Sequence, residues 1–181
     1  MCRLFGYVSL KPESFAQAVG EKLPEFVRLS SVHCDGWGVA TTAPSNPASA
    51  LDSVISQKYR NEIQGETDSE RYFYFILSKI EKHGLVEGVL SAVREIKENF
   101  DFSSINAMLM TDSQFITICE HDPERKPDWA ADGYYDIYYK CNDGDLVVAS
   151  SGWDQAGWDN LPNHHVLIVD RATLNQQVLA L

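Results

Sequence analysis

The sequence predicts a single α+β domain over residues 1–181. Two observations lead to this fold class. The middle of the chain carries two consecutive stretches with apolar residues at three- and four-residue spacing, which is typical of amphipathic helices. The last third carries short apolar runs separated by turn residues, which is typical of β-hairpins. Helices and strands grouped in this way favour sheets with helical covering layers.

The beginning of the chain predicts a strand followed by a helix. The run from Arg3 to Ser9 is almost continuously apolar, so we expect a strand that is buried on both faces. Pro12 predicts the first turn of a helix, and Pro24 predicts a kink or a break in it. Residues 38–42 predict a second strand. The apolar positions of the first helix are Phe15, Val19, Leu23 and Phe26.

The two amphipathic stretches predict helices over residues 67–82 and 86–100. Thr67 and Glu70 have the spacing of a capping box at the start of the first helix. Gly84 is a suitable stop between the two helices. We expect both apolar faces to pack together on one face of a sheet, through Phe73, Ile76, Leu77, Ile80, Val89 and Val93.

The remaining segments predict paired strands. The expected hairpins join residues 107–110 to 115–119 and residues 135–140 to 146–149, and further strands at 166–169 and 178–181 end the chain. The tyrosines of this region are expected to pack along strands rather than to form a binding surface. They are Tyr134, Tyr135, Tyr138 and Tyr139.

Charge and hydropathy narrow the classes of function. The formal net charge is −11 and the calculated isoelectric point is about 4.8, which argues against a nucleic-acid partner, because such a partner needs a basic surface. No apolar run approaches the ~20 residues that span a bilayer. The first residues do not have the pattern of a secretory signal. We therefore expect a cytoplasmic protein with no nucleic-acid partner and no membrane partner.

The cysteine and histidine pattern gives no support to a metal or disulfide site. None of the four cysteines forms a C-x-x-C pair. Cys119 lies in an apolar run and is expected to be a core residue, and Cys141 borders a turn and is expected to be structural. His164 and His165 are neighbours in a strand and would point to opposite faces. We assign no metal and no cofactor.

Cys2 stands out because of its position after Met1. Removal of the methionine would leave a thiol and a free α-amino group on the same residue. That amine has an ordinary pKa of ~7.7–8.0, so it can act as a general base near neutral pH, where lysine would need a large shift. One residue would then supply both nucleophile and base. The alternative is a buried cysteine that opens a core strand.

Four ordered segments resemble class II glutamine amidotransferases, which carry an amino-terminal cysteine. Within this family they are most similar to a small stand-alone branch that includes YafJ-like proteins, the ergothioneine-pathway amidohydrolase and the yeast glutathione-degrading amidotransferase. The segments are CRLFGYV at residues 2–8, HCDGWGVA at 33–40, TDSE at 67–70, and VVASSGW at 147–153 with LPN at 161–163 and VLIVDR at 166–171.

The resemblance implies a fold and a set of site residues. The fold would be the four-layer αββα sandwich of the N-terminal nucleophile hydrolases. Cys2 would attack a γ-glutamyl amide through a thioester, and Asp68 would hold the α-ammonium group of the substrate. Asp68 has an alternative role, because an acidic residue in the first turn of a helix favours the helix dipole. Gly36, Trp37 and Gly38 would be pocket or structural residues.

One part of the family pattern is absent from the sequence. The family normally has two further strands between the DGWG and TDSE segments, which carry an arginine for the substrate carboxylate and an Asn-Gly pair for the oxyanion hole. Here Arg60 is the nearest cation, and Asn61 is followed by Glu62. The sandwich would then be incomplete. An interruption of the sequence as it stands, an internal deletion and a change to a non-catalytic role all remain open.

Two functions follow from these observations. The first is a γ-glutamyl amide hydrolase that uses Cys2 on glutamine or another γ-glutamyl compound. The second is a catalytically inactive binding or regulatory subunit that keeps the fold. The resemblance leaves a homo-oligomer or a partner enzyme open in both cases.

Overall fold

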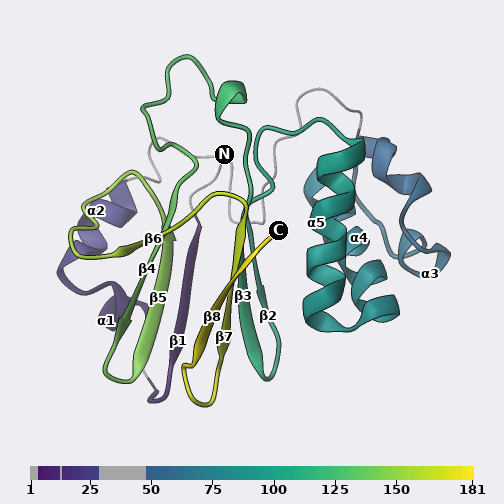
Figure 1. The fold of residues 1–181 in the computed structure, drawn as a ribbon. Helices are drawn as coiled ribbons and strands as arrows, with labels where there is room; N and C mark the ends of the chain where they lie inside the picture. Colours follow the sequence, from purple (N-terminus) through teal and green to yellow (C-terminus); the bar gives the residue numbers. More distant parts are fainter. Residues whose placement is uncertain (1–3, 13, 29–47) are drawn as a thin grey trace.

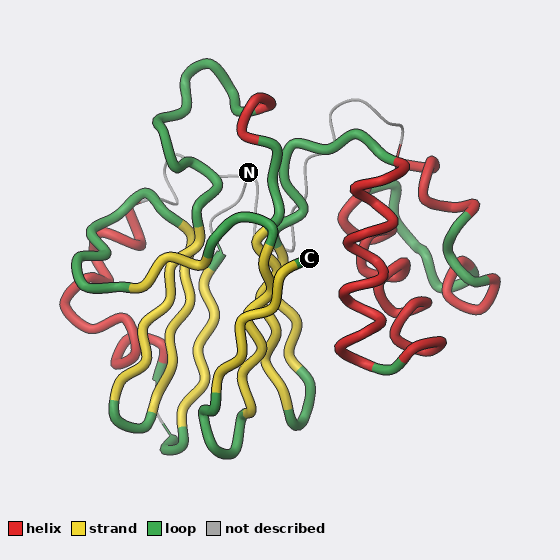
Figure 2. Tube along the Cα trace, in the orientation of Figure 1, coloured by secondary structure: helices red, strands yellow, loops and turns green. Residues whose placement is uncertain are grey.

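Two antiparallel sheets with helices on their outer sides form the structure, a computed structural model that describes residues 4–12, 14–28 and 48–181 (Figures 1 and 2). The first sheet has the strand order β1-β5-β4-β6 and the second has the order β2-β3-β7-β8. The first sheet consists of β1 (Phe5–Ser9), β4 (Ile137–Asn142), β5 (Asp145–Ser150) and β6 (Asp159–Leu161). The second consists of β2 (Ala107–Met110), β3 (Gln114–Cys119), β7 (His165–Asp170) and β8 (Gln176–Ala180).

The two predicted hairpins are confirmed. Strand β2 pairs antiparallel with β3, and β4 pairs antiparallel with β5 across a turn in which Gly144 has a φ of 99°. Strand β4 begins at Ile137 rather than at Tyr135, because Asp136 N–H donates to the Gly133 carbonyl in a turn before the strand. Strand β6 was not predicted, since its three residues are too short to show an alternation.

The sheets pack face to face through an apolar cluster drawn from both of them. Successive side chains of a strand point to opposite faces, so the strands β2, β3 and β7 of the second sheet contribute to two cores. In β3, Phe115 and Cys119 contribute to the cluster between the sheets, whereas Ile116 and Ile118 contribute to the core beneath the helices. The buried residues between the sheets are Val8, Phe115, Cys119, Ile137, Leu146, Val148, Leu161, Leu167, Val169 and Leu174.

Two long helices, α4 (Asp68–His83) and α5 (Leu85–Asn99), cover the outer face of the second sheet, as predicted (Figure 1). The Thr67 hydroxyl accepts from Glu70 N–H at 3.3 Å and caps α4. The Glu70 carboxylate does not complete the capping box. It accepts instead from the backbone N–H groups of Gln64 and Gly65, at 2.8 and 2.7 Å.

The buried face of α4 differs from the predicted one by about one residue. Ile76 is buried as expected, but Phe73 is 45% exposed, so its assignment to the core was wrong. Tyr72 and Phe75 take the core positions instead. The pattern was ambiguous because almost every position from 72 to 77 is apolar or aromatic. Tyr72 is accommodated in the core because its hydroxyl donates to the Ile105 carbonyl at 3.0 Å.

The first helical segment is divided into short pieces. The first piece begins at Phe15, and Ser14 caps it through a capping box with Gln17, so the prediction that Pro12 lies in its first turn was wrong. The break comes at Gly20, whose φ is 60°, and Pro24 lies in the first turn of the next helix. The short helices are α1 (Phe15–Val19), η1 (Gly20–Lys22), α2 (Leu23–Arg28), η3 (Ala48–Ser53), α3 (Gln57–Arg60) and η4 (Pro123–Arg125).

The cysteine assignments can be compared with the structure at two positions. Cys119 is fully buried on β3, and burial raises the pKa of its thiol to about 12, so it is a core residue and not a nucleophile. Cys141 is exposed on β4 and forms no disulfide.

Candidate functional site

The upper end of the sheets in Figure 1, where β1 begins and β5 ends, brings several polar residues together. Leu4, which directly precedes β1, donates its N–H to the Ser150 hydroxyl at 3.0 Å, and Ser150 N–H donates back to the Leu4 carbonyl at 3.0 Å. Ser150 is almost fully buried at the end of β5. The path of the chain into β1 is therefore held in place by a buried hydroxyl and two backbone groups.

Asp68 is the predicted site residue that the structure describes. It is half-buried in the first turn of α4, and its carboxylate accepts from the Ser69 hydroxyl at 3.4 Å. Helix α5 ends at the upper end of the molecule in Figure 1, and α4, which precedes it by the single residue Gly84, runs antiparallel to it. The first turn of α4 therefore lies at the end of the molecule where β1 begins.

A chain of hydrogen bonds connects α4 with the loop between β3 and β4. Tyr72, one turn after Asp68, donates to the Ile105 carbonyl. The next residue, Asn106, is 2% exposed and uses both ends of its amide: Nδ2 donates to the Tyr135 carbonyl at 2.7 Å, and Oδ1 accepts from Glu120 N–H at 2.8 Å. The helix layer, the second sheet and the loop are thus joined at this end by buried polar contacts.

His121 lies at the centre of this region. The residue is 8% exposed, and its Nδ1 is buried without a hydrogen-bond partner among the described residues. Burial lowers the pKa of His121, and the carboxylate of Asp136 opposes this shift only in part. The ring lies on Tyr135, with 5.4 Å between centroids. The backbone is held on both sides by Asn163, whose Oδ1 accepts from His121 N–H at 3.0 Å and whose Nδ2 donates to the His121 carbonyl at 2.8 Å.

A cavity of about 190 Å³ opens beside this histidine. The loop that forms it is tied to the end of β5, because the Ser151 hydroxyl donates to the Gly133 carbonyl at 2.6 Å and Ser151 N–H donates to the Asp136 carbonyl at 2.9 Å. Since Ser150 also holds Leu4, the cavity and the beginning of β1 share one support. The cavity is lined by His121, Pro123, Lys126, Asp132, Gly133, Tyr134, Tyr135 and Asp136.

Glu120, the residue directly after β3, forms a second polar cluster. This cluster lies on the side of the strand end opposite to His121. Its carboxylate is only 1% exposed, and it contacts His164 Nδ1 at 2.9 Å and Lys97 Nζ at 3.1 Å. His164 has a φ of 64°, which is uncommon for a residue with a side chain. These contacts join α5, β3 and the turn before β7, and they balance a buried charge.

The other predicted site residues cannot be compared with the structure. Cys2, Gly36, Trp37 and Gly38 lie outside the described residues. Arg60 is described, and its guanidinium donates to the Ile55 carbonyl at 3.1 Å, so it serves the turn after η3.

Sequence reasoning missed Asn106, Glu120 and His121. A signal was present in the sequence. Glu120 and His121 directly follow the apolar run 115–119, and Asn106 directly precedes the strand that pairs with this run, so all three fall at the same edge of the sheet. What could not be read from sequence is that Glu120 and His121 point to different sides.

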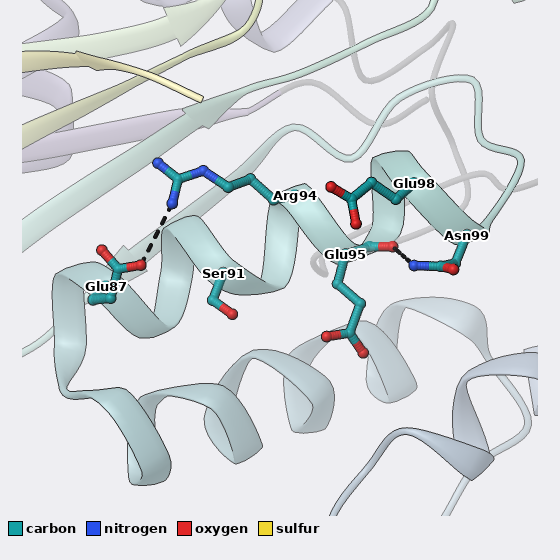
Figure 3. Close-up of a pocket in the computed structure, with 6 residues that line it drawn as sticks. All are labelled: Glu87, Ser91, Arg94, Glu95, Glu98 and Asn99. Atoms are coloured by element: carbon teal, nitrogen blue, oxygen red, sulfur yellow. Dashed lines mark hydrogen bonds and ion pairs between the residues drawn. The ribbon is translucent and has the colours of Figure 1, made fainter.

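Two other hollows lie in the described part of the chain. One, of about 310 Å³, runs along the surface of α5, where Glu87 pairs with Arg94 at 3.4 Å and Glu95 points toward α4 (Figure 3). Its remaining lining is polar, and it offers ordinary helix-surface contacts. The other, of about 390 Å³, lies at the opposite end of the sheets, where Arg171 N–H donates to the Ser113 carbonyl at 2.9 Å.

Neither a metal-binding cluster nor a membrane-spanning helix is present in the described ranges. No group of three or more His, Cys, Asp or Glu side chains there could hold a metal ion. Among the helices of those ranges, none combines the length and the apolar character needed to cross a membrane.

Comparison with known proteins supports the fold alone. No family model matches the sequence, and no curated protein matches it. Six solved chains match the structure. One is a glutamine aminotransferase class-II domain protein from Silicibacter pomeroyi, with a TM-score of 0.56 and 15% identity over 80% of this chain. This chain covers 64% of the length of that protein. The mixed helix-and-sheet fold is therefore like that of a class II glutamine amidotransferase domain.

Proposed function

We propose that this chain is a γ-glutamyl amide hydrolase with the four-layer αββα sandwich of the N-terminal nucleophile hydrolases and with Cys2 as nucleophile. The observation that carries the proposal is the placement of Asp68 in the first turn of α4, at the end of the sheets where β1 begins. Cys2 is two residues before Leu4 in the sequence.

The proposed reaction proceeds in two steps. The Cys2 thiol transfers its proton to the α-amine of the same residue, and the sulfur attacks the γ-carbonyl carbon. The C–N bond then breaks, the proton passes to the leaving nitrogen, and a γ-glutamyl thioester remains. Water attacks the thioester, releases glutamate and restores the thiol. No cofactor enters this scheme.

Asp68 is proposed to hold the α-ammonium group of the substrate. A half-buried carboxylate forms a stronger contact with an ammonium ion than one in open water, because fewer water molecules screen the pair. The net charge of −11 supports a small-molecule substrate over nucleic acid. We propose that the reaction takes place in the cytoplasm.

A second candidate function is a binding or regulatory subunit without catalysis. The contacts of Arg60 and Asn61 favour it, because these residues lie nearest in sequence to the missing segment and both already bond to neighbouring residues. Arg60 donates to the Ile55 carbonyl, and the Asn61 side chain accepts from Gln57 Nε2 at 2.8 Å. Neither of them matches a carboxylate clamp or an oxyanion donor.

We expect Met1 to be absent from the purified native protein, because the proposed base is the free α-amine of Cys2. Amino-terminal sequencing tests this directly. After incubation with a γ-glutamyl amide, intact-mass measurement should detect a γ-glutamyl adduct that Cys2→Ala protein lacks. A retained Met1 on folded protein, together with the absence of an adduct, would leave the binding subunit as the better candidate.

We expect Asp68→Asn to raise the half-saturating concentration of a γ-glutamyl substrate about tenfold, because one charge-assisted contact to its ammonium group is lost. The readout is the concentration dependence of adduct formation or glutamate release. Glu87→Gln is the matched control, since it removes an acidic residue from the first turn of α5. Equal effects of the two variants would reduce Asp68 to its role at the helix dipole.

A further inference from the structure

The cavity beside His121 has the features of a ligand site in its own right. We propose that it binds a small α-amino acid in its zwitterionic form, with the ligand carboxylate on Lys126 and the ligand ammonium on Asp136. The cavity, of about 190 Å³, corresponds to about six water molecules at ~30 Å³ each, which is the size range of a small amino acid.

His121 forms part of the cavity wall. Its Nδ1 has no hydrogen-bond partner among the described residues, but this atom has almost no accessible surface, so it lies within the wall and does not face the ligand. Burial lowers the pKa of the ring, so His121 adds no positive charge to the cavity near pH 7. The charges that a ligand meets therefore come from the other lining residues.

Lys126 gives the cavity a positive charge that can pair with a ligand in place of Asp132. Lys126 Nζ contacts Asp132 at 2.9 Å, but the Asp132 side chain is fully exposed, whereas that of Lys126 is only 25% exposed. An ion pair with one partner in open water is weak, because water screens it. A ligand carboxylate inside the cavity would meet the same ammonium group with less screening.

Asp136 supplies the opposite charge. It is half-buried, and its Oδ2 accepts from the Tyr138 hydroxyl at 3.4 Å, a long contact that leaves accepting capacity on the carboxylate. The carboxylate lies over Gly133, where an added Cβ would come within 2.7 Å of Oδ2. With Lys126 and Asp136 in the lining, the cavity matches a ligand that carries both charges better than a simple anion or cation.

The walls are fixed before any ligand binds. Tyr134 and Tyr135 are 5% and 3% exposed, and their rings meet edge to face with 5.1 Å between centroids. Asn106 and Ser151 hold the loop at the Tyr135 and Gly133 carbonyls. A preformed site loses less conformational entropy on binding than a mobile loop would.

The amino acid can come from two sources. It can be the amine that is released when a γ-glutamyl amino acid is cleaved, in which case this source rests on the proposed function. It can equally be a free amino acid that binds beside the site. Both sources present the same carboxylate and ammonium groups to Lys126 and Asp136.

The test is a titration of the full-length protein with L-alanine, followed by the ring resonances of His121 and by calorimetry. We expect saturable binding and a shift of these resonances. Alaninamide lacks the carboxylate and N-acetylalanine lacks the ammonium group, so each should bind about tenfold more weakly. Lys126→Met and Asp136→Asn should each weaken alanine binding by a similar factor. Lys58→Met is the matched control, because it removes an exposed lysine paired with Glu81 on the helix layer.

Absence of saturable binding in folded wild-type protein would overturn the proposal, as would equal binding of alanine and both of its blocked derivatives. Because the titration requires no hydrolysis, failure of the proposed activity does not affect it. The source is then assigned by kinetics. A Lys126→Met defect with γ-glutamylalanine but not with glutamine would identify the leaving amino acid, and weakened alanine binding without this difference would identify a free ligand.

Discussion

Glutamine hydrolysis by the 181-residue chain is expected to be about 10²–10³-fold or more below the ~1–10³ turnovers per second of ordinary enzymes. The reason is the missing stabilisation of the oxyanion. A thioester pathway develops negative charge on the γ-carbonyl oxygen, and loss of a single preorganised donor costs ~10²–10³ in rate. No residue in the sequence matches the Asn-Gly pair or the carboxylate-binding arginine of the family.

The structure argues against two asparagines as replacements for the missing oxyanion donors. Both of these asparagines hold the backbone around the candidate site and are already engaged. Asn106 spans the Tyr135 carbonyl and Glu120 N–H, and Asn163 uses both ends of its amide on the His121 backbone. Turning either of them toward a substrate would leave buried backbone groups without partners, at a cost of about 1–3 kcal/mol each.

The measurement is glutamate release from glutamine and from γ-glutamyl dipeptides, with Cys2→Ala protein as the blank. Alkylation of Cys2 is not a substitute, because a thiol beside its own amine can react without an oxyanion hole. Turnover at ordinary rates would show that other residues rebuild the hole. Activity that appears only in a form with the two additional strands would attribute the loss to their absence.

The sequence predicted the architecture better than it predicted the site. Hairpins and the α4–α5 pair depend on local patterns of turn residues and apolar spacing, and these were sufficient. The rotation of α4 was not predictable, because Tyr72 and Phe73 are both aromatic and only the Ile105 carbonyl identifies the buried one. Local propensity carries no information about such long-range partners.

The candidate site, too, could be predicted only where a local sequence motif marks a residue. Asp68 could be named because a family motif surrounds it. The helix start predicted at this motif is confirmed, and the role of Asp68 in substrate binding stays a prediction. His121, by contrast, belongs to no motif. Its significance comes from the cavity that it lines together with Lys126 and Asp136. These properties arise from packing of the loop between β3 and β4, which sequence spacing does not reveal.

The contact between α4 and α5 leads to the prediction with the largest expected effect on stability. Gly88 lies in the first turn of α5, where an added Cβ would be 2.5 Å from the Ile80 Cα atom and 2.8 Å from the Lys79 carbonyl carbon. Both are backbone atoms of α4, so they cannot move aside as a flexible side chain could. The glycine therefore sets the distance between the two helices that cover the second sheet.

We expect Gly88→Ala to lower the free energy of unfolding by about 2 kcal/mol or more. Alanine favours an isolated helix over glycine by about 1 kcal/mol, so this preference opposes the expected change. The steric cost is larger, because α4 and α5 must separate above a core in which Val93 is fully buried. Thermal and denaturant unfolding measure the difference, and a loss of about 4–8 °C in Tm corresponds to it at this chain length.

The control is Ser91→Ala, on the side of α5 that lines the surface hollow, and it should be neutral or slightly stabilising. If Gly88→Ala were as stable as the parent, the helices would tolerate separation, and the first turn of α4, with Asp68, would not be held by this contact.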